Sequence, residues 1–331
     1  MIYIIFIGIP IIYLIIIAIL RCQRQKYLNN LTSNHEIFKE IFTMEFPFMW
    51  SKSMELAIIN TFPHSSIYPR LSINNKFIDN PELRYDDSEL IMREVFEHGV
   101  YSERGQKAIK RLNFIHSHFN IDNESYLYVL ALFVYIPVKL INNFEWRKFT
   151  EKEINAIVKV ISDVGKEMKI KNVPDNYQGY INIVNNCYNS GKIKVDDRKR
   201  SVYIFNSVLD MFLRAYPSCL HGIIKTALFT LMDKEITDGL MIEKPNDCNM
   251  SCIKSLLHFR AYVIKYFFPP RSGCCRDLRT SRVEGGKPRY GRFTKEKYCV
   301  GCPIKQVYHN GYNIKNLGKY KRVSERGVEV L

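Results

Sequence analysis

Two neighbouring helices joined by a very short turn are the feature that most restricts how this 331-residue chain can fold. The first begins with Asn-Pro-Glu at 80–82, which gives an N-cap residue, a proline suited to the first helical position and an acid in the first turn. It ends at Gly99, a residue type favoured just after a helix. The second begins after Ser102 as N-cap and runs to Asn120. Such a short connection makes the two helices antiparallel neighbours.

This hairpin brings three chemically useful side chains to one height. Ser88 and His116 lie eleven and fourteen residues from the two ends of the turn, which corresponds to roughly 17 and 21 Å along the helices. Arg84 lies one turn from Ser88 on the same helix face. His116 belongs to the apolar stripe of the second helix, whereas His118 points about 200° away. On spacing alone, a hydrogen-bonded core imidazole is the commoner explanation of His116, and metal ligation is the alternative.

An uncharged apolar segment opens the chain. Ile2–Leu20 contains nineteen residues without a charge, about the length of one bilayer core. No basic region precedes it and no small-residue cleavage site follows it, which favours a retained anchor over a removed signal peptide; an uncleaved secretory signal is the alternative. Arg21 and Arg24 follow directly, so the positive-inside tendency predicts a single-pass protein whose domain faces the cytosol. We expect a transmembrane anchor at 1–22 and a linker at 23–45.

The residues after the linker, 46–270, predict one all-α domain, since strand signals are scarce. A helix is expected after Phe46, followed by a proline-punctuated loop. The apolar segment 125–141 is long enough to cross a membrane, yet it contains Pro137 and Lys139. We therefore expect a buried core helix there.

Further helix boundaries follow from local signals. Asn123 is expected to be the N-cap of the core helix, and Thr150 with Glu153 forms a capping box for the next one. Residues 174–193 are rich in Asn, Tyr and Gly and predict a loop. Apolar helices are expected within 200–232 and 250–267.

The C-terminal tail, 271–331, differs in character from the domain. It holds 15 Lys or Arg against 5 Asp or Glu, and so carries much of the net charge of +15. We expect a solvated tail; contact with anionic lipid is the simpler alternative beside a membrane anchor, and no nucleic-acid partner is expected. Cys274-Cys275 and the pair Cys299-x-x-Cys302 leave a structural zinc site open, although an adjacent pair makes a poor half-site.

Several familiar catalytic motifs are absent from the sequence. It contains no G-x-G-x-x-G, no Walker A motif, no G-x-S-x-G and no H-E-x-x-H. A haem-thiolate loop of the form F-x-x-G-x-x-x-C is also absent. Nucleotide-binding, serine hydrolase and zinc protease functions therefore have no support.

An ordered series of short motifs covers residues 46–175. They are Phe46-Pro47-Phe48, Arg84-Tyr85-Asp86-Asp87-Ser88, Ser102-Glu103-Arg104, Arg111-Leu112-Asn113-Phe114-Ile115-His116, Asn123 through Tyr128, Phe133-Val134-Tyr135-Ile136-Pro137, Glu145-Trp146-Arg147-Lys148-Phe149-Thr150 and Gly165 through Met168. The series resembles the catalytic domain shared by bacterial rubber oxygenase (latex-clearing protein) and the fungal ER-bound prenyl-chain oxygenase of mycophenolic acid biosynthesis. It is more similar to the fungal branch.

The resemblance implies an all-α domain that binds haem b and cleaves carbon–carbon double bonds of isoprenoid chains with O2. It implies that His116 is the axial ligand of the haem iron. Arg84 and Ser88 are then expected on the opposite side, where they position or polarise bound O2. The expected partners are a lipid or prenylated small-molecule substrate and a membrane, by default that of the endoplasmic reticulum.

Five positions depart from the family pattern. Ser88 replaces a threonine but keeps the hydroxyl, and Asp87 replaces a lysine that in rubber oxygenase can reach the iron. Ile136 replaces a glutamate and Val160-Ile161 replace a Phe-Trp pair, which predicts a changed contact behind the site and a changed pocket shape. Two other functions stay open: a catalytically impaired haem-binding sensor or scaffold, and a non-haem membrane adaptor whose basic tail binds zinc or lipid.

Overall fold

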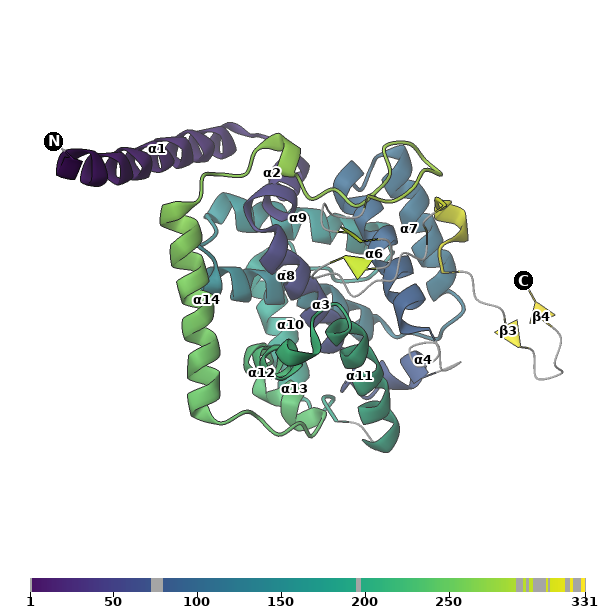
Figure 1. Ribbon diagram of the computed structural model, residues 1–331. Coiled ribbons are helices and arrows are strands. Elements are labelled where there is room, and N and C mark those ends of the chain that lie inside the picture. Colours follow the sequence, from purple (N-terminus) through teal and green to yellow (C-terminus); the bar gives the residue numbers. More distant parts are fainter. Residues whose placement is uncertain are drawn as a thin grey trace.

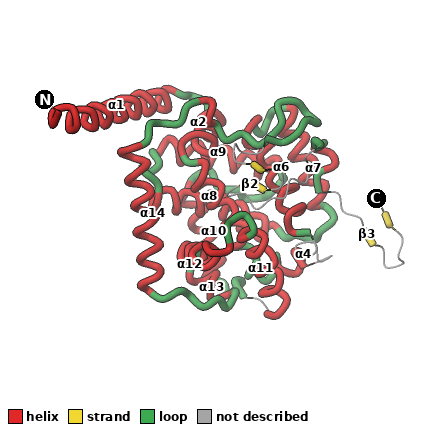
Figure 2. The backbone as a smooth tube through the Cα atoms, viewed as in Figure 1, coloured by secondary structure: helices red, strands yellow, loops and turns green. Residues whose placement is uncertain are grey.

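The structure, a computed structural model, describes residues 2–72, 80–194 and 198–289, together with 294–295, 298–299, 308, 310–318, 322–323 and 329–330. Over these ranges the chain is built almost entirely from helices (Figures 1 and 2). Within them, strands occur as two antiparallel pairs near the C-terminus, and each strand is two residues long. The prediction of an all-α fold is confirmed.

The elements are named in chain order. The helices are α1 (Ile2–Asn30), α2 (Asn34–Glu40), the π-helix η1 (Ile41–Glu45), α3 (Pro47–Ile59), α4 (Tyr68–Ser72), α6 (Pro81–His98), α7 (Glu103–His116), α8 (Asn123–Phe144), α9 (Glu151–Glu167), α10 (Tyr177–Asn189), α11 (Arg198–Leu213), η3 (Ser218–Leu220), α12 (His221–Leu231), α13 (Lys234–Gly239), α14 (Asp247–Phe267), η4 (Gly273–Cys275) and η5 (Ile314–Asn316). The strands are β1 (Thr294–Lys295), β2 (Tyr298–Cys299), β3 (Arg322–Val323) and β4 (Glu329–Val330). Helices α11, α12 and α14 lie where apolar helices were expected.

The predicted hairpin is formed by α6 and α7. Gly99 ends α6 with a φ of +97°, a backbone conformation that favours glycine. Ser102 caps α7 by accepting a hydrogen bond from the Gly105 N–H at 3.0 Å. A Cβ on Gly105 would lie 2.0 Å from the Gly99 carbonyl oxygen, so only glycine allows this close approach. The hairpin is confirmed, although Asn80 makes no side-chain cap bond and α7 ends earlier than expected, at His116.

Helix α8 lies in the middle of the helical body and contacts α3, α9 and α10 (Figure 1). Its N-cap is Asp122, which accepts from the Ser125 N–H at 2.8 Å. The prediction of Asn123 as cap was wrong, because its side chain instead bonds the backbone after α9. The Tyr128 hydroxyl donates to the Asn60 carbonyl at 3.2 Å. The apolar window of α8 is 56% buried, so the expected core helix is confirmed.

Helix α1 projects from the body (Figure 1). Its apolar window lies within Gly8–Asn30 and is only 6% buried. Among the described residues, α1 and α8 are the two helices long and apolar enough to cross a membrane. Because α8 is packed inside the body and α1 is not, α1 is the helix placed to serve as an anchor.

The prediction of a linker at 23–45 was wrong. Helix α1 continues to Asn30, and α2 and η1 then enter the hydrophobic core. Phe38 makes edge-on ring contacts with Trp50 and Phe96, at centroid distances of 5.2 and 5.0 Å. The apolar residues of this stretch follow helical spacing and bury one face, which outweighs its polar composition.

The loop expected at 174–193 is largely helix α10. Asn176 caps it by accepting from the Gly179 N–H at 2.9 Å. Tyr180 and Val184 lie one turn apart and are both fully buried. The Asn- and Tyr-rich composition gives weak helix propensity, and burial of this stripe overrides it.

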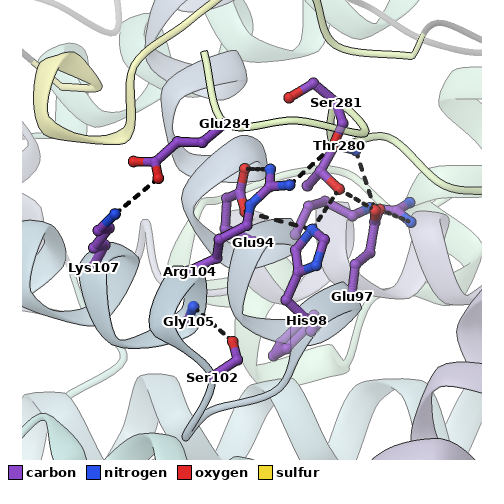
Figure 3. Close-up of polar contacts among 12 residues, drawn as sticks. Glu94, Glu97, His98, Ser102, Arg104, Gly105, Lys107, Thr280, Ser281 and Glu284 are labelled. Atoms are coloured by element: carbon purple, nitrogen blue, oxygen red, sulfur yellow. Dashed lines mark hydrogen bonds and ion pairs between the residues drawn. The ribbon is translucent and has the colours of Figure 1, made fainter. Parts of the chain in front are cut away.

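The tail was expected to be solvated, and for residues 276–281 this is wrong. They pack along α6 and α7, as Figure 3 shows. Glu97, buried on α6, accepts hydrogen bonds from the backbone N–H and the hydroxyl of Thr280, at 3.2 and 2.5 Å. Arg104 on α7 donates to the Ser281 carbonyl at 3.0 Å. The physical reason is that a buried carboxylate needs donors, and the tail provides them.

The cysteine pairs considered for zinc are only partly covered by the structure. Cys274 and Cys275 are exposed, with their Sγ atoms 3.7 Å apart. Cys302 and the side chain of Cys299 lie outside the described residues. Within the described part of the chain, no three His, Cys, Asp or Glu side chains group together as a metal site.

Candidate functional site

A cavity of about 310 Å³ lies inside the helical body, lined by residues of α3, α6, α7, α8 and α11. Most of its wall is hydrophobic. The apolar lining residues are Trp50, Met54, Ile58, Ile67, Leu71, Pro81, Ile91, Met92, Phe96, Leu112, Ile115, Phe119, Ile121, Val129, Leu130, Phe133, Val164, Met168, Ile170, Val208, Met211 and Phe212. A cavity of this size and character is typical of sites for small molecules and cofactors.

Arg84, Ser88 and His116 all line this cavity. The first two lie one turn apart on α6, and His116 is the last residue of α7. The convergence predicted from spacing in the hairpin is therefore found in the structure. The roles assigned to the three residues stay a prediction.

His116 presents a neutral imidazole to the cavity. Its ring lies beside that of Tyr126, with centroids 5.5 Å apart. Its Nδ1 is buried and has no hydrogen-bond partner among the residues that the structure describes. Burial, together with a smaller contribution from the charge of Arg84, lowers the pKa of His116 to about 4. The imidazole is thus neutral at physiological pH, the form in which histidine ligates a metal.

Arg84 keeps a positive charge beside the same cavity. Burial lowers its pKa to about 10, while the nearby Asp87 carboxylate acts in the opposite direction. Burial raises the pKa of Asp87. The hydroxyl of Tyr308, the N–H of Gly318 and the charge of Arg84 act in the opposite direction and lower this pKa. At neutral pH the guanidinium remains protonated, so it can stabilise a negatively polarised atom in the cavity.

The hydroxyl of Ser88 is engaged with its own helix. Its Oγ donates to the Arg84 carbonyl oxygen at 2.9 Å, one turn back. The oxygen can still accept a hydrogen bond in this rotamer, but its proton is in use. To donate to a ligand, the side chain would have to rotate about χ1.

His118 lies away from the cavity. It is exposed to solvent, its ring packs against that of Phe114 at 4.8 Å, and its Nδ1 lies 2.7 Å from the Phe114 carbonyl oxygen. The structure therefore separates the two histidines as the apolar stripe of the second helix predicted. His116 faces the cavity and His118 faces water.

A second polar cluster at the cavity was not predicted from the sequence. The Lys52 ammonium on α3 donates to both carboxylate oxygens of Glu55, at 2.9 and 2.8 Å. The Tyr85 hydroxyl reaches Glu55 at 3.4 Å, and both Glu55 and Tyr85 line the cavity. The sequence signal was a Lys–Glu pair three residues apart within an otherwise apolar helix. This cluster gives the cavity a second polar region besides that of Arg84.

Part of the C-terminal tail, residues 308 and 310–318, packs against the hairpin beside the cavity, which the sequence also did not reveal. Tyr308 donates a hydrogen bond to the Asp87 carboxylate, and Arg111 donates through Nε to the Leu317 carbonyl at 2.6 Å. Gly318 itself lines the cavity. Apolar residues two or three positions apart in this stretch are buried, and their spacing was the available signal.

Of the departures from the family pattern, Ser88 and Asp87 line the cavity, and the other three do not. Ile136, Val160 and Ile161 are buried in the hydrophobic core. None of the three is among the described residues that line the cavity. The expected change in pocket shape at these positions stays a prediction.

Comparison with known proteins supports the same family resemblance as the motifs. No protein-family model matches the chain. ER-bound oxygenase mpaB' of Penicillium brevicompactum is 26% identical over 276 residues, which is 78% of this chain and 64% of that protein. ER-bound oxygenase mpaB of the same organism is 34% identical over 128 residues, 37% of this chain and 32% of that protein.

A second ER-bound oxygenase mpaB, from Penicillium roqueforti (strain FM164), is 33% identical over 129 residues, 37% of this chain and 43% of that protein. The matched region therefore spans less than two thirds of the length of each of these relatives. The more extensive of the matches covers most of the helical body as well as the hairpin. By these comparisons, the chain resembles the ER-bound oxygenases of Penicillium.

Proposed function

We propose that this chain is a membrane-anchored, haem-dependent oxygenase that uses O2 to cleave a carbon–carbon double bond in an isoprenoid or other lipid chain. The observation that carries the proposal is His116, a neutral imidazole on an apolar cavity that also holds Arg84 and Ser88. The names of the relatives support an oxygenase reaction. The substrate class comes from the family resemblance.

The residues of the cavity fit a haem. His116 lines a mostly apolar cavity with a neutral imidazole, the form in which histidine ligates iron. When bound, haem b supplies the binding and activation of O2. His116 would hold the iron, and the apolar wall would enclose the porphyrin.

The remaining residues of the site would orient the reactants and polarise oxygen. Arg84 keeps its charge at neutral pH and so stabilises negative charge that develops on oxygen. Ser88, once its hydroxyl rotates away from the Arg84 carbonyl, supplies a second donor. The hydrophobic wall excludes water and accommodates an alkene chain.

Membrane attachment suits a substrate of this kind. Helix α1 is apolar, almost unburied and projects from the body. A lipid chain partitions into the bilayer, so an enzyme anchored there meets it at a raised local concentration. We place the protein in the endoplasmic reticulum membrane with its helical body on the cytosolic side, as the names of the relatives and the basic residues after the apolar segment favour.

An absorption spectrum of the detergent-purified protein, oxidised and reduced, tests the proposal directly. After supplementation with haem we expect a Soret band that shifts on reduction, and O2 consumption with at least one member of a panel of prenylated lipids. A protein that shows no Soret band would refute haem binding. A protein that keeps the band but consumes no O2 would point to the sensor or scaffold function instead.

A further inference from the structure

Helix α14 runs along the side of the body from which α1 projects (Figure 1). It contacts α12 and α8 on its inner side and α1 near its C-terminal end. Ile253 and Ala261 are buried on this inner side, and Arg260 forms an ion pair with Glu145 at 3.0 Å. Helix α14 is therefore fixed to the body, and its other face is left to the outside.

The outer face of α14 is apolar and aromatic. Leu256, Phe259, Tyr262 and Tyr266 follow one another at intervals of three or four residues, and all four are exposed. The rings of Tyr262 and Tyr266 lie 4.8 Å apart. A contiguous exposed stripe of this kind is unusual on a surface that meets only water.

The C-terminal end of α14 is joined to the apolar part of α1. The Tyr13 hydroxyl donates to the Phe267 carbonyl at 2.9 Å, and the Arg21 guanidinium donates to the carbonyls of Ile264 and Phe268 at 2.5 and 2.7 Å. Tyr13 and Arg21 are eight residues apart, roughly 12 Å along the helix. The end of α14 thus lies beside the last third of the predicted anchor, at the depth where a bilayer passes from acyl chains to headgroups.

We propose that the outer face of α14, together with the exposed Phe267 and Phe268 that follow it, lies in the membrane interface and contacts lipid. Aromatic side chains favour this layer, and a helix with one apolar face lies in its plane. Exposed basic residues flank the stripe, as anionic headgroups would require: they are Lys254, Lys265 and Arg271. A lipid bilayer is the occupant favoured here, because the joined α1 brings one to this height.

The inference rests on α1 being the membrane anchor of the proposed function. It adds that the helical body is not connected to the membrane through a flexible linker alone. Two helices joined by hydrogen bonds would hold it against the bilayer in one orientation.

A photo-reactive benzoylphenylalanine placed at single positions of the full-length protein tests the proposal. The protein is reconstituted into vesicles of phosphatidylcholine and phosphatidylserine, irradiated and analysed for lipid adducts by mass spectrometry. The probe replaces Phe259 on α14, Leu14 on α1 or Phe114 on α7. Phe259 and Phe114 are matched in residue type and in exposed fraction, 65% and 56%, and α7 lies on the far side of the body from α1 (Figure 1).

We expect lipid adducts at Phe259 and Leu14, several-fold above the yield at Phe114. Adducts at Leu14 with none above the Phe114 level at Phe259 would overturn the interface while leaving the anchor intact. Cross-links from Phe259 to a second copy of the chain in place of lipid would overturn it as well. Absence of lipid adducts at Leu14 would overturn the anchor and the interface together. Haem binding is measured separately, so its loss or retention does not enter this test.

Discussion

His116 and Arg84 face one cavity from two antiparallel helices, and the charge of Arg84 adds to the effect of burial in keeping the imidazole of His116 neutral. At neutral pH the guanidinium is protonated and the imidazole is not. The two groups are therefore already in the protonation states that a metal ligand and an oxygen-polarising cation require. The predictions below test this division of roles.

Replacement of the proposed ligand should remove the cofactor. His116→Ala takes away the imidazole that faces the cavity, so we expect loss of the Soret band or a strong shift of its position. His118→Ala is the matched control, because His118 lies two positions away and is exposed. Its spectrum should equal that of the unsubstituted protein. An unchanged spectrum for His116→Ala would remove His116 from the haem site.

Haem affinity should hardly depend on pH between 7 and 5. Since the pKa of His116 is lowered to about 4, protons compete with iron for the ring only near and below that pH. A histidine with an ordinary pKa would lose about 25-fold in apparent affinity over the same interval, whereas we expect a change of less than about twofold. Haem titrations at the two pH values measure this, with circular dichroism to check that the protein stays folded. A drop of the larger size would show that the imidazole is protonated near pH 6.

The hydroxyl of Ser88 should matter for turnover and not for haem binding. Ser88→Ala removes a donor beside the cavity, and we expect the rate of O2 consumption to fall by roughly 10- to 100-fold. Ser88→Thr keeps the hydroxyl and should retain most of the activity. Ser117→Ala is the control, because its hydroxyl also bonds a backbone carbonyl of its own helix, at 2.8 Å, but on the exposed surface. Equal rates for the alanine variants at 88 and 117 would exclude a role for Ser88.

The buried carboxylate of Glu97 should hold the segment 276–289 in place. Glu97→Gln replaces an acceptor of hydrogen bonds from Arg279 and Thr280 by a partial donor, so we expect a loss on the order of 2 kcal/mol in the free energy of unfolding. Trypsin should then cut faster within the segment. Glu103→Gln is the control, since Glu103 is exposed and pairs with Lys107 at the surface. Proteolysis at one rate in both variants would mean that Glu97 does not anchor the tail.

The hairpin could be predicted from sequence because its determinants are local. The turn at Gly99, the cap at Ser102 and the capping box at Thr150 each depend on residues within four positions, and all three occur in the structure. Helical spacing then placed Ser88 and His116 at one height without any knowledge of the core.

The parts that were missed depend on contacts distant in sequence. Phe38 is buried because Trp50 and Phe96 surround it, and composition around 23–45 does not show this. Helix α10 forms because Tyr180 and Val184 are buried, against weak propensity. Glu55 faces the cavity from α3, and no local signal in the sequence links this position to the hairpin.

The contact between Tyr308 and the hairpin also has a consequence for assembly. Tyr308 and its partner Asp87 are 221 positions apart, so the hairpin is synthesised long before the residue that donates to this carboxylate. Until Tyr308 and Gly318 have been synthesised, Asp87 lacks two of its hydrogen-bond donors and the cavity lacks Gly318 from its lining. The cavity therefore reaches its final lining only after this part of the tail has been made and has docked on the hairpin.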